Sequence, residues 1–112
     1  MIGPIVTVTV DRPLGSGHPE HPDMYFPVNY GHVKGMTAAD GAEEGAYILG
    51  VSEPVPEFTG RIIAVIKRED DIGHNWVVAP EGGVFTKKEI AELTAFQEQY
   101  FTSEIILLYK RF

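Results

Sequence analysis

Residues able to bind phosphate and metal ions gather in two neighbouring stretches of the sequence. The first reads YFPVNYGHV (25–33), where Pro27 fixes its own backbone and a turn-compatible asparagine and glycine flank Tyr30. The second reads DGAEEGAYILG (40–50), an acidic turn that feeds an apolar segment. A tyrosine hydroxyl beside a carboxylate turn is a plausible phosphate and metal site. The same pattern also suits two strands joined by a turn with nothing bound.

Composition describes one small domain and excludes several functions. The chain has 112 residues, 44% of them hydrophobic, and this length supports a single modest core. The formal net charge of -7 argues against a nucleic-acid partner, because phosphate backbones are bound by basic faces. It is compatible with divalent cations. The absence of cysteine excludes disulfides and thiolate metal sites.

The sequence has no pattern typical of a signal peptide or of a membrane-spanning helix. The opening MIGPIVTVTV lacks a basic region and alternates with threonine, unlike a signal peptide. No apolar run approaches the ~20 residues that a membrane-spanning helix needs. We therefore expect a soluble, cytoplasmic protein with no membrane partner.

The elements that must position these residues are mostly short strands. Five segments have strand patterns and are separated by turns rich in glycine and proline: 5–10, 25–33, 46–51, 61–67 and 76–79. In the first, three valines at alternate positions (Val6, Val8 and Val10) are expected to face the core. The intervening segments 11–23, 40–45 and 52–60 are expected to be loops. Five strands in this arrangement predict a small β-barrel or sandwich.

The last third of the chain changes to a helical pattern. Thr86 and Glu89 have the spacing of a capping box. Apolar residues follow on one arc, which predicts an amphipathic helix of about fourteen residues across the barrel; they are Ile90, Leu93, Phe96, Tyr100 and Phe101. The final apolar run 105–108 is either a short strand or a contact for another subunit, so we expect a homo-oligomer.

Four segments resemble the soluble inorganic pyrophosphatases. YFPVNYGHV is similar to a strand of that family with a Y-P-x-N-Y-G core, and the segment from Asp40 is similar to its D-x-D-x-x-D signature. GRIIAVIKREDD (60–71) resembles a later strand that leads into a metal-binding loop, and FQEQYF (96–101) resembles the start of its terminal helical region. The resemblance covers roughly 6–101. It implies an α+β fold, a five-stranded OB-like closed β-barrel with one amphipathic C-terminal helix.

The resemblance also implies a reaction and a set of site residues. In that family several Mg²⁺ ions bridge the oxygens of diphosphate and acidify a water that attacks it. Carried over to this chain, Asp40, Asp70 and Asp71 would hold metal, with Tyr30, Asp40 and Asp70 at the catalytic centre. Arg12, Tyr30 and Tyr100 would contact the substrate phosphates.

This chain departs from the family pattern at several of these positions. The second and third acidic places of the signature are Ala42 and Gly45, and the lysine expected after Tyr100 is Phe101. A further carboxylate and lysine would fall near His74 and Asn75. No residue is assigned to activate water; Glu43, Glu44 or Asp71 would have to be recruited. Losing several charged partners should leave slow hydrolysis or none.

Other functions and simpler explanations stay open at this point. The barrel could be a non-catalytic module that binds a phosphorylated ligand or a cation, or a structural barrel that forms oligomers. Tyr30 and Tyr100 could serve packing alone, Asp40–Gly41 is a common turn pair, and the acids at 69–71 could simply be solvated. His18 and His21 in HPEHPD suggest a transition-metal site, although two prolines exclude the helix that would align them.

Overall fold

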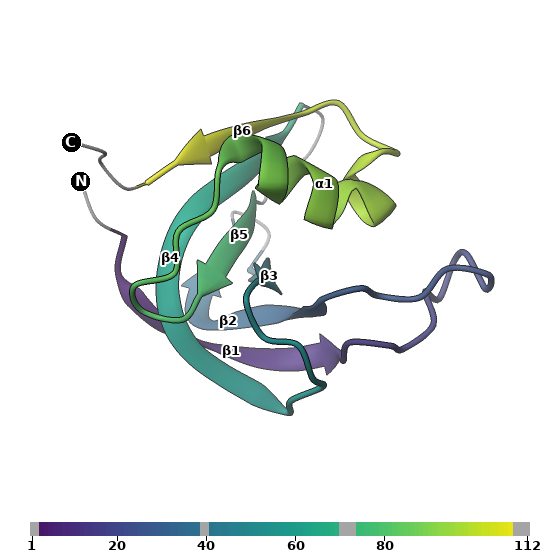
Figure 1. Ribbon diagram of the computed structural model, residues 1–112, viewed down its shortest axis with the longest axis horizontal. Helices are drawn as coiled ribbons and strands as arrows, with labels where there is room; N and C mark the ends of the chain where they lie inside the picture. Colours follow the sequence, from purple (N-terminus) through teal and green to yellow (C-terminus); the bar gives the residue numbers. More distant parts are fainter. Residues whose placement is uncertain (1–2, 39–40, 70–73, 109–112) are drawn as a thin grey trace.

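Among the residues that the computed structural model describes (3–38, 41–69 and 74–108), six strands form one mixed sheet that closes on itself (Figure 1). The elements in chain order are β1 (Ile5–Arg12), β2 (Asn29–Thr37), β3 (Glu43–Ile48), β4 (Glu57–Arg68), β5 (His74–Ala79), α1 (Lys87–Glu98) and β6 (Ser103–Leu107). In Figure 1, α1 covers one side of the sheet near β5 and β6.

Five of these strands make a closed ring. The order is β1-β2-β3-β5-β4, and an additional antiparallel pairing of β1 with β4 joins the two ends. The neighbours β3 and β5 run parallel, and the other pairs are antiparallel. This confirms the predicted five-stranded closed barrel with one helix. The run 105–108, for which two roles were open, contributes to β6, which pairs with β4 outside the ring.

β4 is the longest strand and the one that the others share. Its first part pairs with β1, its last part with β6, and its opposite edge with β5. Residues 62–66 are all buried, because side chains of both faces are covered. At the middle of β4, the Ile62 N–H donates to the carbonyl of Pro4 at 2.9 Å, and the Ile63 carbonyl accepts from Leu108 N–H at 2.8 Å. Residues 4 and 108 are therefore held on adjacent positions of one strand.

The core has two parts, one on each face of the sheet. Inside the barrel lie Val8, Val33, Ala46, Ile48, Ile62 and Val78, and the flanking Val6 and Val10 pack against them as their alternation predicted. On the outer face, beneath α1, lie Val28, Tyr47, Leu49, Ile63, Ala64, Ile66, Val77, Ala79 and Ile90. Neighbouring residues such as Ala46 and Tyr47 thus belong to opposite sides of the same strand.

The helix begins where its capping box predicted. The Thr86 hydroxyl accepts from Glu89 N–H, and the Glu89 side chain accepts from Thr86 N–H. The helix is 12 residues long and ends at Glu98, so the predicted length of about fourteen was too great. Tyr100 and Phe101 lie beyond it and are 52% and 47% exposed. They do not extend its apolar arc.

Several predicted boundaries were wrong: strand pairing carries β1, β3 and β4 into segments that were expected to be loops or turns, whereas β2 begins later than expected. The expected loop at 11–23 begins later, since β1 pairs with β2 as far as Arg12. The expected turn at 40–45 ends earlier, since β3 begins at Glu43. The strand expected at 25–33 begins only at Asn29, and β4 begins within the expected connection 52–60.

Among the described residues, no helix has the length and hydropathy needed to cross a membrane.

Candidate functional site

A pocket of about 450 Å³ contains all three residues that were predicted to contact phosphate. Arg12 comes from the end of β1, Tyr30 from β2, and Tyr100 from the segment after α1. The remaining wall comes from the loop between β1 and β2, the end of β4 and the end of α1. The residues are Arg12, His18, Pro19, Glu20, His21, Phe26, Tyr30, Arg68, Gln97, Tyr100 and Phe101.

Strand pairing places the first two of these residues together. Arg12 and Tyr30 are cross-strand partners at the last register position of the β1–β2 ladder, just after an irregularity in β1. Directly opposite residues on antiparallel strands hold their side chains close to each other. The Arg12 side chain is exposed, and in the described part of the chain no hydrogen bond or ion pair engages its guanidinium group. It is therefore available to an anion.

The loop that borders the pocket is fixed to the barrel by Asn29. The buried Asn29 Oδ1 accepts from Leu14 N–H at 2.9 Å and from Val55 N–H at 3.2 Å, and its Nδ2 donates to the Glu53 carbonyl at 2.9 Å. Within the loop, Gly15 N–H donates to the Phe26 carbonyl. The proline-rich segment is thus part of the ordered wall of the pocket.

His18 attaches the same loop to α1. Its Nδ1 accepts from Glu20 N–H at 3.1 Å, which leaves Nε2 as the protonated nitrogen that donates to Gln97 Oε1 at 3.1 Å. Both ring nitrogens are thereby occupied. His21, the second histidine of HPEHPD, stacks on Tyr100 with ring centroids 4.4 Å apart. The suggested transition-metal site is not formed among the described residues, because both His18 nitrogens are engaged and no three possible ligands are grouped together.

Beneath the pocket, the carboxylate of Glu98 is the centre of a buried network. Glu98 is 8% exposed and accepts four hydrogen bonds. Arg68 donates two of them, from Nε at 3.1 Å and from Nη2 at 2.8 Å. Tyr47 Oη donates at 2.6 Å and Asn75 Nδ2 at 3.1 Å. Gln97 Nε2 in turn donates to Tyr47 Oη at 2.8 Å. The network satisfies a charge that would otherwise be costly to bury.

The same network sets the protonation of nearby side chains. Burial raises the pKa of Tyr30 to about 12, with the charge of Arg68 opposing this. Burial, and then the negative charge of Glu98, raise the pKa of Tyr47 still further above its usual range. Burial alone would lower the pKa of Arg68, but its hydrogen bonds to Glu98 raise it. Both tyrosines are therefore neutral hydroxyl groups at neutral pH.

Gly45, at the third acidic place of the family signature, lies directly against Tyr30. Tyr30 Oη donates to Asn75 Oδ1 at 2.7 Å, and a Cβ atom added to Gly45 would come within 2.5 Å of that same Asn75 oxygen and would overlap Tyr30 Oη. The hydrogen bond thus occupies the space that a side chain at 45 would need. Ala42, at the second place, is exposed and supplies no ligand.

The carboxylates available for a metal ion fall into two sets. Asp40, Asp70 and Asp71, the predicted ligands, lie outside the described residues. Glu43 and Glu44, the suggested replacements, point to other partners. Glu43 Oε1 lies 3.2 Å from His32 Nε2, and Glu44 Oε2 accepts from Trp76 Nε1 at 2.6 Å. Across the described ranges no three acidic or histidine side chains are grouped so that they could hold a metal ion together.

Aromatic rings form much of the pocket wall. Tyr100 stacks on His21 at an interplanar angle of 6°, and the guanidinium carbon of Arg68 lies 3.8 Å from the centre of the Phe101 ring. His18 stacks on the buried Phe26, with centroids 5.4 Å apart. Phe101 stands where the family resemblance placed a lysine. One wall of the pocket is therefore apolar where a cation was expected.

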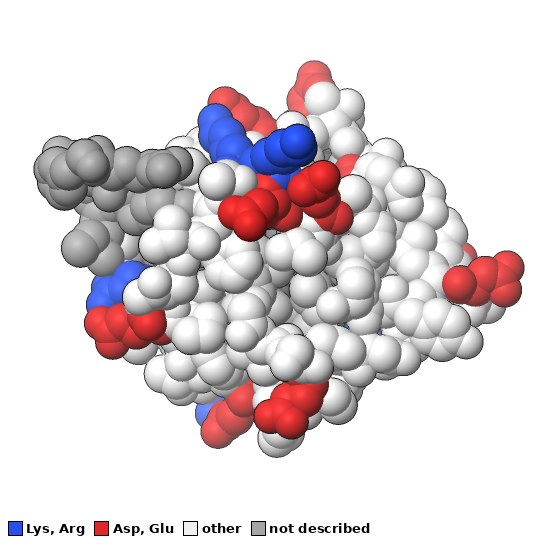
Figure 2. Space-filling view, in the orientation of Figure 1, with Lys and Arg blue, Asp and Glu red and all other residues white. Residues whose placement is uncertain are grey.

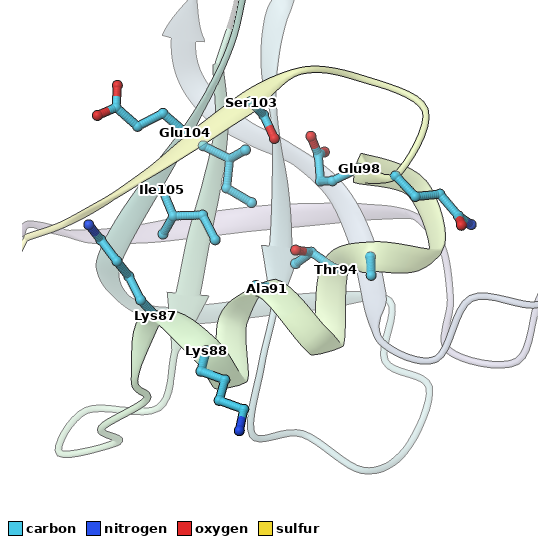
Figure 3. Close-up of a pocket in the computed structure, with 11 residues that line it drawn as sticks. Lys87, Lys88, Ala91, Thr94, Glu98, Ser103, Glu104 and Ile105 are labelled. Atoms are coloured by element: carbon cyan, nitrogen blue, oxygen red, sulfur yellow. The ribbon is translucent and has the colours of Figure 1, made fainter.

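A second pocket, of about 510 Å³, lies between α1 and β6 (Figure 3). Lys87 and Lys88 lie at the start of the helix, and Glu98 lies at the other end of the pocket. None of the predicted phosphate-binding residues lines it.

The face in Figure 2 carries acidic side chains over several elements, and the visible basic side chains lie beside acidic ones. No broad basic area is visible on that face.

Comparison with known proteins identifies the fold. The chain is similar to the inorganic pyrophosphatase of Ehrlichia chaffeensis, with a TM-score of 0.70 and 18% identity over 93% of this chain and 86% of that chain. For the enzyme of Neisseria gonorrhoeae the TM-score is 0.62 at 18% identity, over 88% and 74% of the two chains. For that of Coxiella burnetii it is 0.62 at 18% identity, over 90% and 83%. No protein-family model and no curated protein matches the sequence. The chain therefore has the OB-like barrel fold of these pyrophosphatases.

Three residues that shape the site had no predicted role. They are Arg68, Gln97 and Glu98, which join β4 and α1 beneath the pocket. One signal was present: Ile90, Thr94 and Glu98 form a buried row with a spacing of four residues. A carboxylate that continues a buried row at the C-terminal end of a helix opposes the helix dipole and therefore indicates a nearby cation.

Proposed function

We propose that this chain is a pyrophosphatase-like protein that binds diphosphate, or another small phosphorylated ligand, in the pocket of Arg12, Tyr30 and Tyr100. The observation that carries the proposal is that these residues, selected from the sequence, come from three separate parts of the chain and line one pocket. The fold shared with solved pyrophosphatases supports the same conclusion.

Each of the three residues has a chemical part in binding. The Arg12 guanidinium can donate two parallel charge-assisted hydrogen bonds to one phosphate group. The Tyr30 hydroxyl keeps its proton at neutral pH, because its pKa is about 12, and it would donate this proton in a hydrogen bond to the anion, in exchange for its hydrogen bond to Asn75 Oδ1. Tyr100 closes the outer side of the pocket. The charge of Glu98 is compensated by Arg68, so it does not oppose the ligand with a full negative charge.

Hydrolysis of diphosphate is the second candidate function. It is favoured by the fold, since the neighbouring structures are of inorganic pyrophosphatases. Asp40, Asp70 and Asp71 would hold Mg²⁺, which would neutralise diphosphate charge and activate a water. Ala42 and the closely packed Gly45 favour binding over turnover, because neither supplies a carboxylate.

Calorimetric titration with inorganic diphosphate tests the binding proposal. We expect Arg12→Ala to weaken binding by about tenfold or more, since a hydrogen bond to a charged group contributes about 1.5–3 kcal/mol. Lys34→Ala is the matched control, because it removes an exposed cation of β2 that pairs with Glu57 and lies outside the pocket lining. Equal affinities of the wild type and Arg12→Ala would overturn the assignment of the pocket.

Phosphate release from diphosphate tests the second candidate. The protein is assayed with Mg²⁺, with Mn²⁺ and without metal, beside Asp40→Ala. Turnover that disappears both without metal and in Asp40→Ala would support the hydrolase. Diphosphate binding with no turnover would support the non-catalytic module.

Two further predictions concern the oligomeric state of the protein and its location in the cell. We propose a homo-oligomer, which sedimentation velocity would detect as a species heavier than the 12.4 kDa chain. An oligomer that binds neither diphosphate nor a cation would support the structural barrel instead. A cytoplasmic location also remains a prediction.

A further inference from the structure

The structure suggests a more specific ligand for the pocket than diphosphate alone. We infer that it takes a phosphate ester carrying a planar ring, of the chemical class of nucleotides and aryl phosphates, with the phosphate at Arg12 and the ring against Tyr100 and Phe101. The inference rests on the proposed function, since it keeps the same phosphate site.

The size and lining of the pocket suit a ligand that carries a ring. At about 450 Å³ it falls within the range of cavities that hold ring-bearing small molecules, on the order of 300–1,000 Å³. Bare diphosphate has only charged and polar surface. Phe26 and Phe101 offer it no polar contact, and Tyr100 offers it only a hydroxyl group, yet the three rings form much of the lining.

Two of these rings, those of Tyr100 and Phe101, are exposed at the border of the pocket. Tyr100 and Phe101 are 52% and 47% exposed, among the large hydrophobic side chains that the fold leaves uncovered. Adjacent exposed apolar side chains that border a cavity are typical of binding sites. Neither ring is needed to cover the buried outer core, whose peripheral members include Leu93 and Phe96 of α1.

The rings of Tyr100 and Phe101 are held in place by neighbouring side chains while remaining accessible. One face of Tyr100 is stacked on His21, and one face of Phe101 lies on the Arg68 guanidinium. Arg68 is fixed in turn by its two hydrogen bonds to Glu98. A ring that is already positioned loses little conformational entropy when a ligand stacks on it. This arrangement suits a planar group, and Arg12 supplies the charge that its phosphate requires.

A matched pair of ligands separates the ring from the phosphate. Calorimetric titration compares phenyl phosphate with methyl phosphate, which carry the same charge and differ in the ring. We expect phenyl phosphate to bind about fivefold or more tightly, the range that stacking of a base on an aromatic side chain provides. Phe101→Leu should reduce this preference and leave methyl phosphate binding nearly unchanged, because Phe101 has no part in the phosphate site. Tyr100→Leu should also reduce the preference for phenyl phosphate. Tyr25→Leu is the control, since Tyr25 is 67% exposed and lies outside the pocket lining.

The outcomes distinguish this inference from the proposed function. Equal affinities for the two ligands, both weakened by Arg12→Ala, would overturn the ring site and leave the phosphate site intact. Failure of both ligands and of diphosphate to bind would overturn both. Circular dichroism of each variant confirms that it is folded. A preference for the ring that persists in Phe101→Leu and in Tyr100→Leu would also overturn the placement proposed here.

Discussion

Gly45 shows why an aspartate could not simply be introduced at the third acidic place of the family signature. The position has no side chain, and the space above it is taken by the hydrogen bond between Tyr30 Oη and Asn75 Oδ1. An aspartate at 45 would have to displace one of these groups. A side chain at position 45 is therefore incompatible with the Tyr30–Asn75 hydrogen bond as it stands in this structure.

Gly45→Ala is expected to destabilise the protein. The new Cβ would lie within 2.5 Å of Asn75 Oδ1, and overpacking of this kind typically costs about 1–3 kcal/mol. Urea unfolding measures the change. Gly17→Ala is the matched control, because a Cβ there meets nothing within 4 Å. Equal stabilities of the two variants would contradict the close packing at Gly45.

Tyr30 should make the stability of the fold depend on alkaline pH. Its pKa is about 12 in the folded protein and about 10 when unfolded, so the folded state keeps a proton that the unfolded state loses. Stability is therefore fully present below about pH 10 and falls as the pH rises through about 12. Tyr47 shifts in the same direction.

Urea unfolding at about pH 9 and about pH 11 measures this effect. We expect Tyr30→Phe to lose less stability between the two pH values than the wild type does. Tyr25→Phe removes an exposed hydroxyl instead and should retain the wild-type dependence. The same alkaline loss in Tyr30→Phe as in the wild type would contradict the shifted pKa.

At the scale of elements, the ion pair of Arg68 with Glu98 connects the last residue of β4 to the last residue of α1. The two residues are 14% and 8% exposed, so the pair is largely shielded from water. It fixes the end of the helix, and therefore the segment that carries Tyr100 and Phe101. The pocket wall thus depends on a contact beneath it.

Glu98→Gln should be strongly destabilising. It removes the negative charge that is paired with Arg68 in the structure, and breaking a buried pair costs about 3–5 kcal/mol. The free energy of unfolding in urea gives the value. Glu92→Gln, at an exposed position of the same helix, should change it by less than about 0.5 kcal/mol. A small effect of Glu98→Gln would show that the pair contributes little.

These elements also show what the sequence could predict. The alternation of Val6, Val8 and Val10 and the capping box at Thr86 are local patterns, and both were confirmed. The Glu98 network was missed because its partners lie 23 to 51 residues away along the chain. Hydrogen-bond partners so distant leave no local pattern that links them, although the spacing of Ile90, Thr94 and Glu98 pointed to Glu98 itself. The grouping of Arg12, Tyr30 and Tyr100 was accessible only through the family resemblance.

At the scale of the whole molecule, the two parts of the core should unfold together. Adjacent residues of one strand serve opposite sides: Val78 lies inside the barrel, whereas Val77 lies beneath α1. Neither part can be exposed without separating the strands that support the other. We therefore expect a single cooperative transition.

Two probes test this expectation. Fluorescence of Trp76, which packs against the barrel interior, should change at the same urea concentration as the helical circular dichroism of α1. Coincident midpoints would show that the helix and the barrel form one unit. Loss of the helical signal at lower urea, with Trp76 fluorescence still native, would contradict it.

Pro4 and Leu108 are hydrogen-bonded to the adjacent residues Ile62 and Ile63 of β4. This proximity bears on the order in which the strands and the helix follow one another along the chain. Because these two positions meet on one strand, a short covalent link between them would leave every strand pairing intact. New termini could then be opened at the exposed turn of Glu81 and Gly82, between β5 and α1. The barrel would then begin with its helix and end with β5. The linear order of the elements is therefore one of several that this architecture can accommodate.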